Sequence, residues 1–364
     1  MKKNIVLFVG ANLVENRPFY HYILREVSHN ISQIDQIIQI NSNKFLVTIE
    51  KILSDDLNLI IISSTTTYTT VSKVLATLLG DTIELKSDML IPSQTKLYEE
   101  GSFLIEVGSS TVNVIKAQEC KALPPVILEV NQTMILHIFD LDIESIEILI
   151  EPLTKSFEID LSYTHITQGW IKVSCKSKKH GEINHFITSA KKLFLGKVID
   201  SKNIFKYLIQ KLSENSKKLT IAESCTGGLI ASKITSQSGA STVLEGSLIT
   251  YSNAIKHEWL GVDQEVFDKF GAVSSECVAQ MNQGAISISK ADFSLAVSGI
   301  AGPSGATEYK PVGTVVIGVG IKNGDKIETI TKEFHFEGDR NYVQDQTLYS
   351  AVKMLIFSNK TIFL

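Results

Sequence analysis

The sequence lacks paired cysteines, a strong excess of charge and any long apolar run, and each absence excludes a class of protein. The four cysteines Cys120, Cys175, Cys225 and Cys277 form no C-x-x-C pair, so neither a zinc site nor a disulfide framework is predicted, and a reducing cytoplasm fits best. The net charge of -4 gives no overall attraction to nucleic acid or to an anionic membrane, so neither is an expected partner. No apolar stretch approaches the ~18 residues of a membrane helix.

The composition is that of an ordinary globular protein. Hydrophobic residues make up 44% and charged residues 20% of the 364 positions, which predicts a large core, no disorder and two or three domains. The first residues, MKKNIVLFVG, resemble a signal peptide only faintly, because Gly10 interrupts a short apolar run and polar residues follow it. We expect this stretch to form a first buried strand.

Residues 1–125 alternate between strand and helix patterns. Such alternation is typical of a doubly wound parallel α/β sheet, and Pro124 with Pro125 then interrupts the chain. We expect strands at 4–9, 34–40, 57–64, 102–107 and 112–115, and helices at 17–30, 44–53 and 71–79.

Two further units follow. Residues 126–200 combine helical spacing with a strand-like alternation and predict a small α+β module, whose lysines we interpret as a solvated face rather than a nucleic-acid surface. Residues 201–364 predict another α/β domain. In the unit 126–200 we expect helices at 144–157 and 182–196 and a strand at 169–177. In the unit 201–364 we expect helices at 203–213, 228–236, 253–261, 274–290 and 341–357 and strands at 218–222, 243–252, 291–299, 313–321 and 326–336.

The stretch AESCTGG, residues 222–228, places small polar side chains between a predicted strand and a predicted helix. Free backbone N–H groups at a helix start favour an anion such as a phosphate, and Ser224 and Thr226 could add hydroxyl contacts. An ordinary helix cap with a glycine-assisted turn explains the pattern equally well. Because no activating histidine adjoins Cys225, we expect that thiol to be buried and inert.

Residues 239–261 supply a possible nucleophile and base. A hydroxyl nucleophile needs a neighbouring base, and a lysine can serve where burial lowers its pKa, so Ser241, Tyr251 and Lys256 are candidate catalytic residues. The alternative is a lysine on a solvated helix face.

A glycine-rich loop and one arginine complete the candidates. The loop 298–314 follows a predicted strand, and its glycines Gly299, Gly302, Gly305 and Gly313 would allow a phosphate or carboxamide to approach the backbone, although a plain turn has the same composition. Arg340 opens the last helix and could pair with a phosphate. The loop fits neither a dinucleotide fingerprint nor a P-loop, and no metal-binding motif is present in this unit.

Six motifs occur in one order between residues 222 and 340, and together they resemble the C-terminal domain of the competence/damage-inducible CinA family. They are AESCTGG, GASTVLEGSLITYSNAIK, GAVSSECV, SGIAGPSG, KPVGTV and GDR. The family includes nicotinamide mononucleotide (NMN) amidohydrolases. The resemblance therefore implies hydrolysis of the carboxamide of a pyridine mononucleotide to nicotinate mononucleotide and ammonia, with neither metal nor cofactor.

The same resemblance implies roles for individual residues. Ser241 and Lys256 match the serine and lysine pair of the family's site, and Tyr251 matches the accompanying tyrosine. Ser224 and Ser298 match site hydroxyls, with Thr226, Gly299 and Gly302 beside them, and Arg340 matches the site arginine; the position of Ser298 is often threonine in relatives. The turn at 222–228 would hold the substrate, with Ser241 as the nucleophile or with a water activated directly.

The first two units resemble the family's full-length form more faintly. The stretches FVGANLVENRP and IIISSTTTYTTVSK stand where relatives carry a Gly-Thr-Glu-Leu-Leu turn and a Thr-Thr-Gly-Gly-Leu-Gly-Pro-Thr run followed by two aspartates. That domain is molybdopterin-binding-like and is linked in some members to ADP-ribose pyrophosphatase activity. Here the glycines and both aspartates are missing, so we expect catalysis to be lost and a role in packing or oligomerisation to remain. The module 126–200 resembles the family's KH-like linker.

The leading hypothesis is therefore an NMN amidohydrolase, cytoplasmic and, by analogy with the family, a homodimer. One alternative is a non-catalytic nucleotide-binding or competence-associated protein. Another is a metal-dependent pyrophosphatase that acts through residues 1–125.

Overall fold

The computed structural model describes residues 2–31, 34–86, 89–128, 133–177 and 182–364, and these divide into two compact units. The first unit holds the described residues up to Thr133 together with Lys176 and Ser177, and the second holds Met134–Cys175 and 182–364. Among the described residues, no helix is both long and apolar enough to cross a membrane.

The first unit is built on a six-stranded sheet. Its strand order is β2-β1-β3-β8-β7-β6, in which β2, β1, β3 and β8 run parallel and β7 and β6 are antiparallel additions, while β4 and β5 form a separate pair. The elements are β1 (Lys3–Val9), α1 (Asn12–Glu15), α2 (Arg17–Asn30), β2 (Gln36–Ile40), η1 (Ser42–Lys44), α3 (Phe45–Ile52), β3 (Leu57–Ser64), α4 (Tyr68–Leu78), β4 (Ile83–Lys86), β5 (Met89–Pro92), β6 (Leu97–Glu99), β7 (Ser102–Val107) and β8 (Ser110–Ala117).

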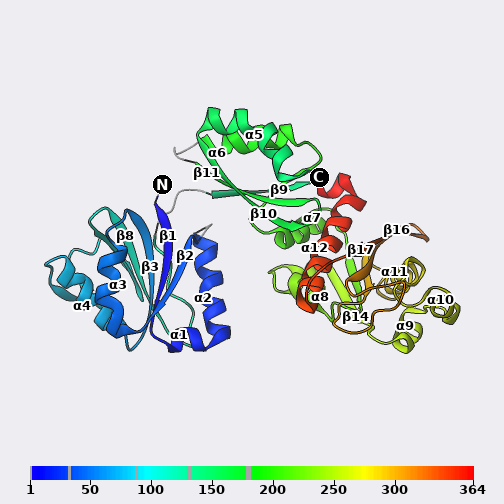
Figure 1. Cartoon of the computed structure of the whole chain (residues 1–364), viewed down its shortest axis with the longest axis horizontal. Helices are drawn as coiled ribbons and strands as arrows, with labels where there is room; N and C mark the ends of the chain where they lie inside the picture. The colour runs from blue at the N-terminus through cyan, green and yellow to red at the C-terminus, as the bar shows by residue number, and fades with distance from the viewer. Residues whose placement is uncertain (1, 32–33, 87–88, 129–132, 178–181) are drawn as a thin grey trace. The chain divides into compact units, whose positions relative to one another are not determined.

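Helices cover both faces of this sheet, as a doubly wound fold requires. Alternate residues of β1 enter separate cores: Leu7 packs with α3 and α4, whereas Phe8 packs with α2. Figure 1 shows α2 on one side of β1 and β3, and α3 and α4 on the other. Every residue of β3 is buried, which confirms the reading of its sequence LNLIIISS as a fully buried strand.

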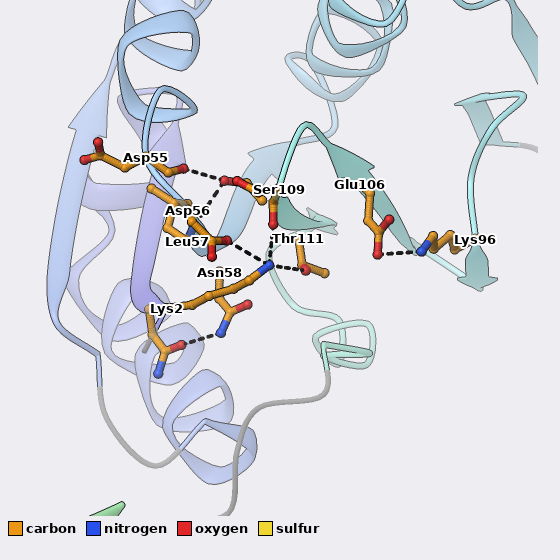
Figure 2. Close-up of polar contacts among 11 residues, drawn as sticks. Lys2, Asp55, Asp56, Leu57, Asn58, Lys96, Glu106, Ser109 and Thr111 are labelled. Carbon is orange, nitrogen blue, oxygen red and sulfur yellow. Dashed lines mark hydrogen bonds and ion pairs between the residues drawn. The ribbon is translucent and has the colours of Figure 1, made fainter. Parts of the chain in front are cut away.

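Polar contacts fix the register at the amino ends of these parallel strands (Figure 2). The Lys2 amine forms an ion pair with Asp56 at 3.0 Å and also bonds the carbonyl of Ser109. The Ser110 hydroxyl donates to the carbonyl of Asp55 at 2.7 Å, and the Asn58 amide donates to Asn4 at 3.0 Å. These side-chain contacts connect the segments that precede β1, β3 and β8, and so hold the amino ends of the three strands together.

The second unit begins with a four-stranded sheet of order β10-β11-β9-β12, covered on one face by α5 and α6. This arrangement matches the small α+β module that the sequence predicts. Its elements are β9 (Thr133–Phe139), α5 (Ile143–Phe157), β10 (Ile159–Thr167), β11 (Trp170–Ser177), α6 (Glu182–Leu193) and β12 (Val198–Asp200).

The rest of the second unit is a five-stranded sheet of order β14-β13-β15-β16-β17, with three parallel strands and two antiparallel ones. One face packs against α7, α8 and α12 and the other against α9, α10 and α11. The elements are α7 (Ile204–Glu214), β13 (Leu219–Glu223), α8 (Leu229–Thr235), η2 (Ala240–Thr242), β14 (Leu244–Ile249), α9 (Asn253–Leu260), α10 (Gln264–Phe270), α11 (Ser275–Ser289), β15 (Phe293–Gly299), β16 (Thr314–Asn323), β17 (Lys326–His335), α12 (Arg340–Ser358) and α13 (Lys360–Phe363).

The two sheets of the second unit share one hydrophobic core. Phe139, Trp170 and Ile199 lie on the face of the small sheet that α5 and α6 leave uncovered, and they pack with α7 and α12. The observed compact units therefore do not separate at residue 200, while the break near Thr133 lies close to the expected boundary at 125.

A buried histidine connects β9 and β11 of the small sheet to the segment that follows β12. The Trp170 indole donates to His137 Nδ1 at 3.0 Å, and His137 Nε2 lies 3.1 Å from the carbonyl of Ser201. This pattern requires the neutral ring, protonated on Nε2. Burial lowers the pKa of His137 to about 4 from its ordinary value of 6.5, and nothing in the sequence pointed to this residue.

We expect His137 to make the second unit acid-sensitive. Because the folded-state pKa lies below the unfolded one, the stabilisation is complete above pH 6.5 and is lost as the pH falls towards about 4, by about 3 kcal/mol in all. Denaturant unfolding followed by Trp170 fluorescence in a Trp259→Phe background should show this loss, and His137→Gln should flatten it. An unchanged slope in His137→Gln, or an equal change with the exposed His21→Gln, would contradict the assignment.

Candidate functional site

Three parallel strands end side by side, and each is followed or closed by a hydroxyl residue. The register pairs Glu223 of β13 with Ile249 of β14 and with Val297 of β15, so the next positions on the three strands are level with one another. Those positions are Thr250, Ser224 and Ser298. Adjacent strands lie about 4.8 Å apart, so the three hydroxyls form a row across the carboxyl edge of the sheet.

Alternation along the strands fixes the face to which this row points. Ala222 and Ala296, two residues before Ser224 and Ser298, belong to the core beneath α9, α10 and α11. Side chains two apart share a face, so the hydroxyls point towards the same helices. The row therefore lies where open α/β sheets bind their ligands.

Lys256 on α9 reaches the centre of this row. Its amine lies 3.1 Å from Ser224 Oγ and 3.3 Å from the carbonyl of Tyr251, and the residue is only 1% exposed. Ser252 caps the helix by accepting from the N–H of Ile255, which fixes the turn from which Lys256 points inward. Burial lowers the pKa of the Lys256 amine and so favours its neutral, basic form.

Two cysteines flank this lysine without being activated by it. Burial raises the pKa of Cys225 to about 12 and that of Cys277 to about 11, and the nearby Lys256 offsets only part of that effect. Both thiols remain protonated at neutral pH, so neither is a thiolate nucleophile. The expectation that Cys225 is buried is confirmed, and its raised pKa agrees with the prediction that the thiol is inert.

The predicted contact between Ser241 and Lys256 is wrong. Ser241 lies in η2, just before the end of β14 that is paired with Leu219 of β13. Tyr251 and Lys256 follow the opposite end of β14. Six residues of β14 place the two ends about 17 Å apart. Ser241 is exposed at the opposite edge of the sheet, and the hydroxyl beside Lys256 is that of Ser224.

The turn after Ser224 is organised by the buried carboxyl group of Glu223. This group accepts from Thr226 Oγ1 at 2.7 Å and from three backbone N–H groups at the start of α8, those of Gly228, Ile230 and Ala231, at 2.9 to 3.1 Å. Of the two readings of this stretch, a free anion site and an ordinary cap, the contacts favour the cap, because an internal carboxyl group already occupies the helix start. Thr226 serves the same contact and is 3% exposed.

Two backbone donors in this turn remain available. Gly227 and Gly228 both have positive φ, of 59° and 98°, which bends the chain sharply after Ser224. Within the described residues, the N–H groups of Cys225 and Thr226 donate to no other atom of the chain. They adjoin the Ser224 hydroxyl in a strand-turn-helix arrangement, the position of an oxyanion hole beside a nucleophile.

Arg340 and Tyr251 meet at the edge of the site. One nitrogen of the Arg340 guanidinium donates to the carbonyl of Gly302 at 2.7 Å, and another donates to the Tyr251 hydroxyl at 3.1 Å. Tyr251 is 61% exposed, and Arg340 is exposed as well. Since a guanidinium carries five N–H donors, Arg340 retains donors for an anion.

The glycine-rich loop is held by contacts that the sequence did not reveal. Ser298 Oγ donates to the carbonyl of Ala272 at 2.8 Å, and the Lys310 amine donates to the carbonyls of Phe270 and Val273 at 2.8 and 2.6 Å. These bonds fix the turn that leads into α11. The Ser298 hydroxyl thus has a structural partner, and its contact with a substrate stays a prediction.

Close packing explains two of the predicted loop glycines. A Cβ at Gly299 would lie 2.7 Å from the Val315 side chain, and one at Gly302 would lie 2.5 Å from that of Val312. Gly302 also has a φ of +85°. Both glycines are therefore required by the fold, and their approach to a ligand stays a prediction.

The corresponding turns of the first unit are closed on themselves. Ser64 Oγ lies 2.8 Å from Thr66 Oγ1 and 3.0 Å from Thr67 Oγ1, and Thr67 Oγ1 also donates to the carbonyl of Val9 at 2.9 Å. Among the described residues, no three His, Cys, Asp or Glu side chains are grouped so as to hold a metal ion.

A protein-family model, individual relatives and solved structures are each similar to part of the chain. The CinA C-terminal domain family model matches residues 201–358. A CinA-like protein of Fervidobacterium nodosum is 46% identical over 157 residues, 43% of this chain and 38% of that protein. A putative competence-damage inducible protein of Caldicellulosiruptor saccharolyticus is 45% identical over 157 residues, 43% of this chain and 37% of that protein. The similarity thus spans little more than a third of these relatives.

Solved structures are similar over a comparable share of the chain. The competence/damage inducible protein CihA from Agrobacterium tumefaciens is 37% identical, with a TM-score of 0.41, over 42% of this chain and 92% of that one. The competence damage-inducible protein A from Klebsiella pneumoniae is 32% identical, with a TM-score of 0.40, over 42% of this chain and 92% of that one.

We expect Glu223→Ala to destabilise the second unit strongly. The substitution leaves three backbone N–H groups and the Thr226 hydroxyl without their acceptor, at a cost of at least about 3 kcal/mol in the free energy of unfolding. Glu245→Ala is the matched control, because it breaks only the partly exposed ion pair with Lys218 and should cost less than about 1 kcal/mol. Denaturant unfolding measures both, and equal losses would refute the role of Glu223.

Proposed function

The chain belongs to the CinA family through residues 201–358, and from this premise we propose that it is a nicotinamide-nucleotide amidohydrolase. It would hydrolyse the carboxamide of NMN to nicotinate mononucleotide and ammonia. The observation that carries this proposal is the contact of 3.1 Å between the Ser224 hydroxyl and the buried Lys256 amine. A hydroxyl beside an amine with a lowered pKa is a nucleophile with its general base.

The proposed reaction begins with Ser224. The neutral Lys256 amine takes the proton of Ser224 Oγ, and the oxygen attacks the carboxamide carbon to form a tetrahedral intermediate. The N–H groups of Cys225 and Thr226 stabilise the negative oxygen. The Lys256 ammonium then returns the proton to the amide nitrogen, the C–N bond breaks and ammonia leaves. Lys256 next deprotonates a water, which hydrolyses the acyl group from Ser224.

The remaining contacts indicate where the rest of the substrate would bind. Because Glu223 occupies the start of α8, that helix has no free N–H group for a phosphate beyond the two beside Ser224. Arg340 is the exposed cation next to Tyr251, so we assign the phosphate to Arg340 and the ribose to the adjoining loop at Gly302.

A non-catalytic, competence-associated binding protein is the second candidate function. The name of the Caldicellulosiruptor saccharolyticus relative records competence and damage induction, and neither its name nor that of the Fervidobacterium nodosum relative records a reaction. Against this candidate stands the burial of Lys256, because burying an amine is costly and a pure binding module gains nothing from it. For the first unit we propose a role in packing or oligomerisation, in a cytoplasmic homodimer, rather than a pyrophosphatase activity.

Ammonia release from NMN tests the proposal directly. With EDTA present, the wild-type chain should turn over, and Ser224→Ala and Lys256→Met should each lose about a thousandfold or more in kcat, because each removes a reacting group. Ser241→Ala is the matched control and should keep most of the activity, since it lies at the other edge of the sheet. Absence of turnover in the wild type would refute the amidohydrolase, and loss in Ser241→Ala alone would refute the Ser224 assignment.

The pH profile tests the role of Lys256. Its lowered pKa means that the amine is protonated and inactive at acid pH, so kcat/KM should rise as the pH rises through that pKa. Lys218→Gln removes a partly exposed lysine and should leave the profile unchanged. Lys256→Arg should be inactive at every pH, because an arginine side chain does not give up its proton. Activity in Lys256→Arg, or a profile without an acid limb, would exclude lysine as the base.

A further inference from the structure

Thr250 carries a buried hydroxyl that the fold leaves unsatisfied. The residue is 0% exposed, and among the described residues its Oγ1 is one of the few buried side-chain oxygen atoms without a hydrogen-bond partner. Its backbone N–H donates to the carbonyl of Glu223 at 2.8 Å, which holds the residue beside the end of β13. An unpaired buried hydroxyl costs about 1–3 kcal/mol, so its presence calls for an explanation.

The position of Thr250 supplies that explanation. It is level with Ser224 on the neighbouring strand, and Leu248, two residues earlier, packs beneath α9, α10 and α11. The Thr250 side chain therefore points to the same face as the Ser224 hydroxyl, about 5 Å away. The next residue, Tyr251, offers its carbonyl to the Lys256 amine at 3.3 Å, so Thr250 lies on the lysine side of Ser224.

We propose that Thr250 Oγ1 contacts the substrate and accepts a hydrogen bond from the carboxamide nitrogen. This inference rests on the proposed amidohydrolase function. The N–H groups of Cys225 and Thr226 can only donate, so they suit the carboxamide oxygen, whereas a hydroxyl can accept from the amide N–H. The contact turns the nitrogen towards Lys256, which must protonate it before the C–N bond breaks.

Thr250→Val and Thr250→Ser separate this role from a structural one. Valine keeps the shape but removes the hydroxyl, so we expect kcat for NMN to fall about ten- to a hundredfold while thermal stability stays equal or rises, since an unsatisfied group is lost. Serine keeps the hydroxyl and should retain most of the activity. The methyl ester of nicotinate mononucleotide is a second probe, because its leaving group has no N–H, and Thr250→Val should change its kcat by less than about threefold.

The outcomes distinguish this inference from the function on which it rests. If the wild type releases no ammonia, the amidohydrolase is refuted and the inference falls with it. If the wild type is active and Thr250→Val is equally active on NMN, only the Thr250 contact is refuted. Equal losses on amide and ester, accompanied by a lower melting temperature, would show a structural role and would also overturn the contact.

Discussion

The buried carboxyl group of Glu223 is the contact on which the candidate site depends. It satisfies the N–H groups at the start of α8 from inside the protein, so the turn after β13 needs no bound anion to hold its shape. Ser224 is the next residue, and its hydroxyl is therefore fixed before a substrate arrives. A site whose polar groups are already oriented loses little free energy to reorganisation during the reaction. The same contact occupies the N–H groups at the start of α8, which is why we propose Arg340 as the phosphate ligand.

The second constraint is the burial of Lys256. A lysine at the end of an apolar core is costly in its charged form. In the described part of the chain, its amine contacts Ser224 Oγ and the carbonyl of Tyr251 and no carboxylate. Both partners can accept hydrogen bonds, and neither compensates the charge. The cost falls on the protonated state, so burial lowers the pKa of the Lys256 amine and favours its neutral form.

Much of the fold could be predicted from the sequence because its elements are strongly periodic. The helix at 17–30 and the strand at 57–64 have the expected bounds, and most strands and helices beyond residue 201 lie within about two residues of prediction. The two sheets of the second unit nevertheless share a core. This shared core forms on the face of the small sheet that α5 and α6 leave uncovered. Local patterns do not report such long-range packing.

The predicted site failed where distance along the chain was taken for distance in space. Ser241 precedes Lys256 by a short segment, but that segment includes β14, which carries the two residues to opposite edges of the sheet. Ser224 is further away in sequence and adjoins Lys256 because β13 and β14 are parallel neighbours. Glu223 and Thr250 were missed since their importance depends on burial and on hydrogen-bond partners, which a single sequence does not show.

The two units of the chain show that a cluster of hydroxyls is not by itself a site. In the first unit, Ser64, Thr66 and Thr67 also follow a parallel strand, but their hydroxyls bond one another and the carbonyl of Val9. In the second unit, the row ends in a buried hydroxyl without a partner and centres on an uncompensated amine. In the described part of the first unit, buried hydroxyls without a partner also occur, at Tyr68 and Ser72, so they do not by themselves mark a site. The buried amine beside the Ser224 hydroxyl, more than the number of polar groups, therefore distinguishes the edge of the sheet at which we place the chemistry.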